Sequence, residues 1–285
     1  MRLLGIGDNV LDHYVDEGKL YPGGNAVNVA VYTAQLGARG NGYIGIVGTD
    51  VQGDHLLTSI EAEGVDTSLV RRTVGPTGSP QVALDADGDR RFVGTNRGGV
   101  QHALRLRLTE DDLVAVAAAD VAHTSVYSSL EDRLAELAAL GPVSFDFSDE
   151  HGDEYVAQVC PHVSHAFFSG AGMPRAEVEA LAAHALRLGC TTAVVTLGAE
   201  GAWVASADGG FVQGTHRVDP VDTLGAGDGF ISGFLYELYS GASVADAALA
   251  GAKAAARACG FNGAFGRAMD FDDIPVEQRP VAIPL

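Results

Sequence analysis

The stretch DTLGAGDGF, residues 222–230, places a glycine-rich turn directly before an acid and an apolar run. The segment 225–241 that it opens is predicted to be a helix that begins at or near the glycines, with Gly241 as its expected end. The first turn of a helix leaves backbone N–H groups unpaired, and the helix dipole adds positive potential there. Residues without bulky side chains let a phosphate approach those N–H groups closely. We therefore expect an anion hole formed by Gly225, Ala226 and Gly227.

Asp228 follows this turn, and its charge needs a separate explanation. A carboxylate repels a phosphate, so a site that only bound phosphate would not contain one here. A hydroxyl nucleophile accounts for it, because Asp228 can accept the proton of a hydroxyl group that attacks the γ-phosphorus of a nucleotide. The alternative is an acid that only completes the start of a helix, where Asp is often found. This stretch alone leaves both interpretations open.

A second glycine-containing stretch, YPGGNAVNVAVYTAQLG, occupies residues 21–37. It predicts a helix that Asn25 could cap, and Gly24 would permit a close approach of the backbone to a ligand. Asn28 follows one turn later and offers both a donor and an acceptor to a polyol. Asp12, upstream, could accept hydrogen bonds from adjacent sugar hydroxyls. The alternative is an ordinary Gly-Gly turn followed by a capping Asn.

Short β-rich runs alternate with longer helical runs along most of the chain. Strands are expected at 2–7, 42–48, 120–126, 143–147, 165–169 and 193–198. Helices are expected at 25–37, 52–64, 108–120, 129–140, 151–160 and 174–189. Near-continuous apolar strands that alternate with helices predict an α/β fold with a mostly parallel sheet covered on both faces. We expect one domain that spans residues 1–285.

Two regions, 9–22 and about 70–100, lack long helical patterns. Within the second, residues 78–96 read as a hairpin, and DADGDR at 85–90 contains an Asp-Gly turn. Short strands inserted into an α/β core often form a lid, so both regions are expected to build a small β lid. Unpaired strand edges seek partners, which makes a homodimer through the lid an expectation. The tail after Gly263 is predicted to be irregular.

Composition limits the partners of the chain. The formal net charge is −19, from 37 acids against 18 bases, so nucleic acid would be repelled. The same field repels ATP, so an ATP site would need a cation and local N–H donors. No apolar run reaches the roughly 18 residues of a membrane helix, and the first 15 residues do not resemble a secretory signal. A cytoplasmic protein without membrane contact is expected.

Cysteine and histidine suggest no metal centre. The three cysteines, Cys160, Cys190 and Cys259, are far apart and are expected to be buried free thiols. His162 and His165 form the closest histidine pair but lack a nearby carboxylate, so they are expected to be solvated or core residues. No P-loop sequence G-x-x-x-x-G-K-[ST] occurs, which excludes that class of nucleotide site.

Together, GGNAVNVA at 23–30 and DTLGAGDGF at 222–230 resemble the two signatures of the ribokinase/PfkB-type carbohydrate kinases. The resemblance covers nearly the whole chain, through IGDNVLD, GIVGTDVQGD, EGVDTS and VVTLGAEGAWV. It implies a ribokinase-like fold and an ATP-dependent kinase that phosphorylates a primary hydroxyl of a small sugar or sugar-amine. GDNVLDHY, GGNAVNVAVY and FDFSD are most similar to the members that phosphorylate fructoselysine at its 6-hydroxyl.

The resemblance also assigns residues. It implies that Asp228 is the catalytic base and that 225–227 form the anion hole. The sugar would be held by Asp12, Gly24 and Asn28. The nucleotide site would be lined by Thr196, Gly198 and Gly201. Some relatives bind a monovalent cation such as K⁺ near the segment that matches Asp222 and Leu224.

One departure concerns magnesium. Many relatives carry an N-x-x-E motif that organises magnesium-bound water, whereas residues 169–172 read SGAG here, without a carboxylate. Mg²⁺ would then be held mainly by the ATP phosphates and water, with help from Asp146 through water. Magnesium keeps several waters and takes few protein ligands, so the loss does not exclude it. The alternative for Asp146 is a buried acid paired with backbone N–H groups.

Other activities of the same fold stay open. Ribose, fructose or a nucleoside could be the acceptor, and the chain could also be a non-catalytic sugar- or nucleotide-binding regulator. A fructosamine of an amino acid carries a carboxylate, and Arg97 or Arg91 of the lid could pair with it. The alternative is that both arginines are only solvated.

Overall fold

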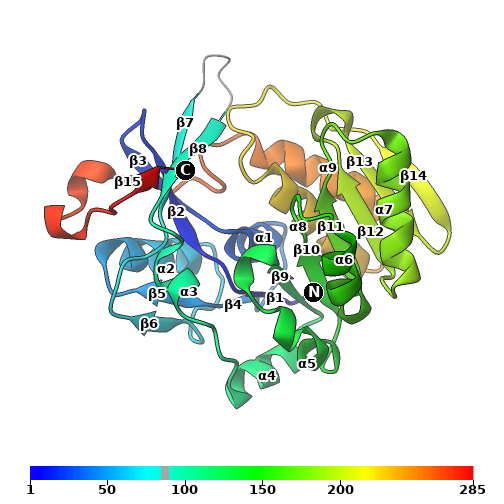
Figure 1. Cartoon of the computed structure of the whole chain (residues 1–285), viewed down its shortest axis with the longest axis horizontal. Coiled ribbons are helices and arrows are strands. Elements are labelled where there is room, and N and C mark those ends of the chain that lie inside the picture. The colour runs from blue at the N-terminus through cyan, green and yellow to red at the C-terminus, as the bar shows by residue number, and fades with distance from the viewer. Residues whose placement is uncertain (85–89, 285) are drawn as a thin grey trace.

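The central sheet has eight strands in the order β14-β13-β12-β11-β10-β9-β1-β4 (Figure 1). The computed structural model describes residues 1–84 and 90–284. The strands are β1 (Leu3–Ile6), β4 (Gly42–Ile44), β9 (Val121–Ser125), β10 (Val143–Asp146), β11 (His165–Ser169), β12 (Thr192–Thr196), β13 (Ala202–Ser206) and β14 (Gly209–Gln213). The six strands β12, β11, β10, β9, β1 and β4 are parallel, and β13 and β14 add an antiparallel edge.

Helices cover both faces of this sheet, as predicted. One face carries α1 (Asn25–Gln35), α8 (Ala226–Tyr239) and α9 (Val244–Ala258). The other carries α4 (Glu110–Ala117), α5 (Leu134–Ala138), α6 (Asp153–Val159) and α7 (Arg175–Arg187). Successive strand residues feed opposite cores, so Phe167 packs with the first group of helices and Phe168 with the second. This two-sided burial explains the near-continuous apolar strands.

A six-stranded sheet forms the lid, in the order β15-β3-β2-β7-β8-β16. Its strands are β2 (Val10–Tyr14), β3 (Lys19–Gly23), β7 (Pro80–Leu84), β8 (Arg90–Thr95), β15 (Met269–Asp270) and β16 (Ile283–Pro284). The predicted lid regions therefore supply its four longer strands. The predicted Asp-Gly turn falls on residues 85–89, which lie outside the described residues.

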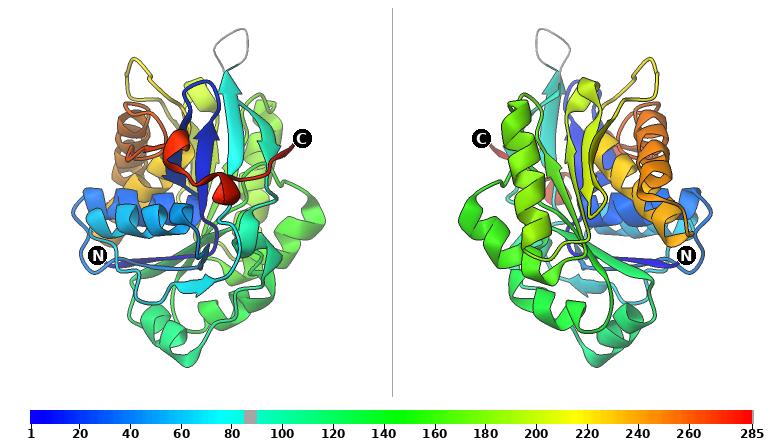
Figure 2. Two further views of the ribbon diagram at one scale, coloured as in Figure 1. Left: turned by 90° about the vertical axis from the view of Figure 1, so that its left-hand side faces the viewer. Right: turned by 90° about the vertical axis from the view of Figure 1, so that its right-hand side faces the viewer.

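The C-terminal tail corrects one prediction. The sequence after Gly263 was expected to be irregular, yet β15 pairs with β3 and β16 pairs with β8, at opposite edges of the lid sheet. Figure 2 shows this segment, in red, crossing the lid strands. Both strands are only two residues long, so no period-2 pattern could reveal them.

The expected strand at 42–48 is also two strands rather than one. After β4 the chain leaves the central sheet, and β5 (Ile46–Gly48) pairs with β6 (Arg71–Thr73) in a separate two-stranded sheet. Gly45 lies between the two strands, and a Cβ atom there would lie 2.0 Å from Tyr43 Oη and 2.9 Å from the carbonyl oxygen of Gly7, so the position requires glycine. The remaining helices are α2 (Val51–Ala62) and α3 (Gly99–Ala103).

Local signals set most helix ends. Thr109 and Asp112 form the predicted capping box of α4. Gly64 follows α2 with a φ of 81°, and Gly241 follows α8 with a φ of 94°, as expected for residues that end helices. The region expected to be one helix at 129–140 contains only the short α5 after a 3₁₀ turn.

The structure also bears on the cysteines and on membrane-spanning segments. All three cysteines are free and buried, as predicted. In the part of the chain that the structure describes, no helix has both the length and the apolar character needed to cross a membrane.

Candidate active site

The site lies where the parallel strands end and the first turns of α1 and α8 meet. Ligands of open α/β sheets bind outside the carboxyl ends of the strands. Asp8 follows β1, Asp146 ends β10 and Thr196 ends β12. Helix α1 contributes Asn25 from its first turn. Strands far apart in sequence thereby deliver polar groups to one edge.

The residues of the predicted anion hole lie at the start of α8. Gly225 is the residue before the helix and has a φ of 79°, a conformation that favours glycine. Within residues 1–84 and 90–284, the amides of Gly225, Gly227 and Asp228 have no acceptor. The Ala226 amide donates to the Thr223 carbonyl at 3.2 Å, so it is engaged in this structure. Unpaired N–H groups at a 14-residue helix make a site for an anion.

The carboxylate of Asp228 is held by two side-chain amides of α1. Asn25 Nδ2 donates to Oδ1 at 2.7 Å, and Asn28 Nδ2 donates to Oδ2 at 2.7 Å. Burial raises the pKa of Asp228 to about 6, the two amides lower it in part, and the charge of Asp8 raises it. A carboxylate with this pKa is ionised near neutral pH and can still accept a proton, as a general base must.

Asn25 does not cap its helix, which corrects the expectation for this residue. Gly24 precedes α1, and Asp8 takes the capping role, because its Oδ2 accepts from the Asn25 amide N–H at 2.6 Å. The Asn25 side chain points to the acids instead, and its Nδ2 also donates to Asp146 Oδ2 at 2.8 Å. His123 Nε2 lies 2.8 Å from Asn25 Oδ1. The sequence interpretation missed these roles for Asp8, Asn25 and His123.

The expected sugar residues line the lid side of the site. Asp12 lies on β2, is 5% exposed, and its pKa is raised to about 7 by burial and by the charges of Asp222, Asp228 and Asp8. A Cβ atom on Gly24 would lie 2.6 Å from the Asn9 Cα, so this position needs glycine. Asn28 Oδ1 is buried and lacks a hydrogen-bond partner within the described chain.

The expected nucleotide residues lie together at the end of β12, whereas Asp12 belongs to the lid sheet and Asn28 to α1. Thr196 ends the strand, and Gly198 begins a 3₁₀ turn, Gly198–Glu200, with a φ of 57°. Gly201 closes the turn, and the Leu197 amide donates to its carbonyl at 2.7 Å. A Cβ atom on Gly201 would lie 2.1 Å from the Gln213 carbonyl oxygen, so the tight loop requires glycine there.

Asp146 is half-buried beside the base. Its Oδ1 accepts from the Ser148 amide at 2.9 Å and its Oδ2 from Asn25. Burial raises its pKa to about 7, the Ser148 amide lowers it, and the charges of Asp228 and Asp8 raise it. Both interpretations of the sequence therefore have support, since the acid is paired with a backbone N–H group and also faces the site. Oxygen donors of this kind suit Mg²⁺.

The described residues contain no group of three or more side chains that could hold a metal ion by themselves. His165 is a core residue as expected, since its ring contacts Thr192 Oγ1 and Tyr239 Oη, and burial lowers its pKa to about 4.

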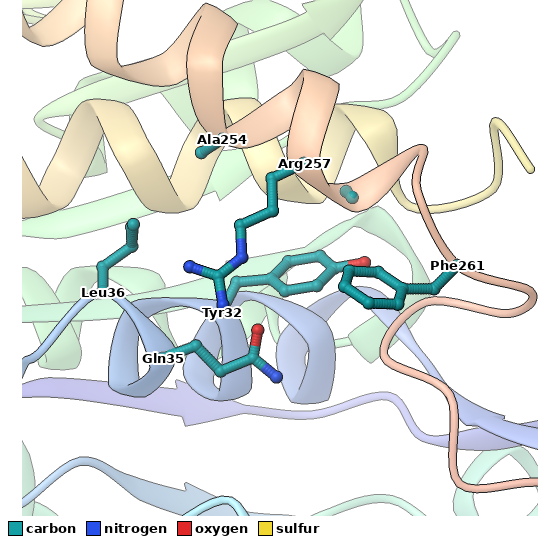
Figure 3. Close-up of a pocket in the computed structure, with 7 residues that line it drawn as sticks. Tyr32, Gln35, Leu36, Ala254, Arg257 and Phe261 are labelled. Carbon is teal, nitrogen blue, oxygen red and sulfur yellow. The ribbon is translucent and has the colours of Figure 1, made fainter. Parts of the chain in front are cut away.

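Asp222 ties the anion-hole loop to the lid. Its Oδ1 accepts from the Leu224 amide at 2.8 Å, and its Oδ2 accepts from the Gly263 amide at 2.8 Å and from Tyr14 Oη of β2 at 2.6 Å. Tyr32 Oη donates to the carbonyl of Ala264 behind this loop. Figure 3 shows the hollow there, where Tyr32 lies beside side chains of α9 and the following loop.

The two lid arginines lie apart from the acids. Arg97 is exposed between β8 and α3 with a φ of 59°, and its guanidinium makes no ion pair within the described residues. Arg91 lies on β8 and is also exposed. Neither is brought into contact with Asp228 in this structure.

Comparison with known proteins agrees with this site. The sequence model of the pfkB family carbohydrate kinases matches residues 4–265. The chain belongs to the pfkB family of carbohydrate kinases. Fructosamine kinase FrlD of Bacillus subtilis (strain 168) is 44% identical over 266 residues, which cover 93% of this chain and 93% of that protein.

Two further relatives define the fold and the activity class. Fructoselysine 6-kinase of Escherichia coli (strain K12) is 34% identical over 264 residues, covering 91% of this pfkB-family chain and 98% of that protein. The ribokinase of Arabidopsis thaliana, solved with ribose and ATP, has a TM-score of 0.80 at 22% identity and covers 95% and 96% of the two chains. The predicted ribokinase-like fold and the ATP-dependent carbohydrate kinase activity are confirmed.

Proposed function

We propose that this kinase transfers the γ-phosphoryl group of ATP to the 6-hydroxyl of a fructosamine, with fructoselysine as its first substrate. The observation that carries the proposal is the placement of Asp228. Its carboxylate is oriented by two amides and belongs to the same helical turn as unpaired backbone N–H groups. Those N–H groups would stabilise the migrating phosphoryl group while Asp228 accepts the hydroxyl proton.

The acids of the site support a cationic sugar derivative. No ion pair joins Asp12, Asp146 or Asp228 to a Lys or Arg within the described residues. The ammonium group of a fructosamine would relieve the mutual repulsion of these carboxylates, whereas ribose or fructose would not. The similarity to fructosamine kinase FrlD and to fructoselysine 6-kinase supports the same substrate class.

Different residues of the site are proposed to bind the sugar and ATP. The sugar would be bound by Asp12, Gly24 and Asn28. The Oδ1 atom of Asn28 can accept a hydrogen bond from a sugar hydroxyl. ATP would extend from the start of α8 toward Thr196, Gly198 and Gly201. The lid would exclude water from the reacting groups. Because ATP is supplied inside the cell, a cytoplasmic location belongs to this proposal.

Magnesium fits the donor set of this site. Asp146 would hold it through water, because each of its oxygens accepts one hydrogen bond from the protein and keeps a lone pair. Bound Mg²⁺ neutralises the charge of the ATP phosphates.

A monovalent cation near Asp222 and Leu224 is proposed as a support of the anion-hole loop. Replacing K⁺ with a tetraalkylammonium ion tests it, and an unchanged rate would contradict it.

A substrate panel tests the proposal. ADP release is measured with fructoselysine, a second fructosamine, fructose, ribose and a nucleoside, with the Asp228→Asn protein as the blank for contaminating kinases. We expect kcat/KM to be highest for the fructosamines, by about tenfold or more over fructose, because the site's acids would otherwise stay unpaired. A preference for ribose or a nucleoside would contradict the substrate class, and sugar binding without ADP release would favour a regulator.

Arg97 is proposed to pair with the carboxylate of the amino-acid part. Its guanidinium is exposed and makes no ion pair within the described residues, so it is available to a ligand. We expect Arg97→Ala to raise the KM for fructoselysine by about tenfold, the effect of losing one charge-assisted contact, and to leave fructose unaffected. Arg39→Ala, which alters an exposed arginine elsewhere, is the control. If Arg97→Ala leaves both KM values unchanged, Arg97 has no such role.

A further inference from the structure

The Asn25 side chain joins the two acids of the site through a single amide nitrogen. Nδ2 donates to Asp228 Oδ1 at 2.7 Å and to Asp146 Oδ2 at 2.8 Å. An amide nitrogen has two hydrogens, so each carboxylate receives one. Rotating the amide by 180° would place its oxygen against both carboxylates, and the two donated hydrogen bonds would be replaced by repulsion. The site therefore needs the Asn25 amide in one orientation.

His123 determines that orientation from behind the site. Its Nε2 lies 2.8 Å from Asn25 Oδ1, and its Nδ1 lies 3.0 Å from Ser144 Oγ. The Asn25 oxygen can only accept, so Nε2 carries the ring proton, and the Ser144 hydroxyl donates to Nδ1. The ring is 0% exposed, and burial lowers its pKa to about 3, so it stays neutral with one proton.

We propose that His123 is a positioning residue that, through Asn25, fixes the carboxylate of Asp228 for attack by the substrate hydroxyl. Ser144, His123 and Asn25 form a chain of hydrogen bonds in which each donor direction is set by the preceding group. These hydrogen bonds run from Ser144 on β10 through His123 on β9 to Asn25 on α1, so three elements of the core together orient the Asp228 carboxylate. This inference rests on the proposed role of Asp228.

Asn28 completes the arrangement from the next turn of α1. It donates to Asp228 Oδ2 at 2.7 Å, so each oxygen of the base is held by a different amide. The Asn28 oxygen is buried and lacks a partner within the described residues, which leaves an acceptor directed to the ligand. With both amides in place, the carboxylate plane has one orientation relative to α1. Of the two side-chain amides that hold Asp228, only that of Asn25 is hydrogen-bonded to His123.

A buried histidine could also serve only to fill the core, and the two roles differ in what they change. A filling role predicts lower stability with unchanged kinetics of the folded protein. The positioning role predicts a slower chemical step with little change in ATP binding. It also predicts that a second change at Asn25 adds nothing, because both changes remove the same hydrogen bond from Asp228.

The test uses His123→Leu, His123→Gln, His123→Asn, Asn25→Ala and the double variant His123→Leu/Asn25→Ala in the full chain. Kinetics are measured with the best sugar from the panel, so failure of the fructosamine assignment is seen separately in the wild-type protein. We expect His123→Leu to lower kcat by about 10- to 100-fold, the usual effect of an outer-shell partner, with KM for ATP within about twofold of wild type. The acid limb of kcat/KM should move to higher pH, because Asp228 loses a donor.

The conservative variants decide the outcome. The Nε2 of Gln can reach the position of the histidine Nε2, so His123→Gln should restore most of the rate, whereas His123→Asn, whose amide reaches only the Nδ1 position, should stay slow. The double variant should be no slower than Asn25→Ala alone. The inference is overturned if His123→Leu keeps its kcat, if the double variant is slower by the product of the two effects, or if the Gln and Asn variants behave alike. The Gln–Asn comparison holds even where His123→Leu fails to fold.

Discussion

At the residue scale, the site depends on a carboxylate whose environment changes its proton affinity. Asp228 has a pKa raised to about 6, and the acids that face it are Asp8, Asp12 and Asp146. The base works in its ionised form. We therefore expect kcat/KM to fall as the pH drops below about 6, toward a tenfold loss per pH unit.

Asn28→Ala tests the origin of this pH dependence. The Asn28 amide stabilises the ionised form of Asp228, so its removal should raise the pKa and move the acid limb to higher pH. A direct assay of sugar phosphate, without pH-sensitive coupling enzymes, measures the profile. An unshifted limb in this variant would show that another group controls the profile.

The residues that local sequence patterns could identify are those whose neighbours in the chain define them. Gly225, Gly227 and Asp228 stand in one helical turn, and their arrangement matches the expectation. Asn25 was interpreted as a cap because caps are local, but its side chain bonds to Asp228, 203 residues away. His123 is 98 residues from Asn25, and nothing in its own strand distinguishes it from a core histidine.

At the scale of elements, the start of α8 is proposed to bind an anion although the net charge of the chain is −19. Apart from its chain neighbours and its own helix backbone, no atom of the described residues lies within 4 Å of a Cβ atom placed on Gly227, so packing does not require glycine there. If a phosphate approaches this turn, the added methyl group would keep it away. A substitution at Gly227 therefore tests whether a ligand needs the space at this turn, without disturbing the packing of the fold.

We predict that Gly227→Ala raises the KM for ATP by about tenfold or more while the free energy of unfolding stays the same or rises by up to about 1 kcal/mol, because Ala favours helices. Steady-state kinetics and urea unfolding measure the two effects. Gly141→Ala, another glycine with open space around its Cβ position, is the control and should change neither. Unchanged ATP kinetics in Gly227→Ala would contradict a phosphate at this turn.

Most of the parallel strands and helices were predictable, and the shortest strands were not. The parallel strands other than the one expected at 42–48, together with α1, α2, α4, α7 and α8, agree with the expectations, whereas the 15-residue α9 was not predicted. Strands β15 and β16 have two residues each, and their place is set by pairing with the lid rather than by their own sequence. The division of 42–48 at Gly45 was also missed, because the close packing of Gly45 against Tyr43 and Gly7 is seen only in the folded chain.

At the scale of the whole molecule, buried acids and a net charge of −19 make stability depend on pH. The folded-state pKa values of Asp12, Asp146 and Asp228 lie above the ordinary value of 3.8. Between about pH 4 and pH 7 these three carboxyl groups bind more protons in the folded chain than in the unfolded chain, so their contribution to stability falls as the pH rises through this window. The lowered pKa values of the buried His123 and His165 act in the opposite direction below about pH 6.5.

Asp12→Asn removes one of these acids, and the Asp12 carboxylate accepts no hydrogen bond within the described residues. We expect it to raise Tm at pH 8 by about 2 °C or more, the shift that about 1 kcal/mol gives in a chain of this size, and to change Tm little near pH 4. Thermal unfolding at both pH values measures this. An equal change at both would mean that its charge is not the cause. One cooperative transition at each pH would also support the predicted single domain.

Quaternary structure stays a prediction. The tail strands cover part of both lid edges, which weakens the argument from unpaired edges, while Phe92 and Val93 of β8 are 52% and 42% exposed. Sedimentation velocity of the full chain would decide between a dimer, as predicted, and a monomer.

The most direct measurement compares ATP binding and turnover in Asp228→Asn. The substitution keeps the backbone N–H groups of α8 but removes the proton acceptor. We predict that calorimetry finds ATP affinity within about threefold of wild type while kcat falls by about 10²- to 10⁴-fold, the usual contribution of a general base. A kcat close to wild type would contradict the account, because the helix start would then act without the carboxylate that it presents to the acceptor hydroxyl.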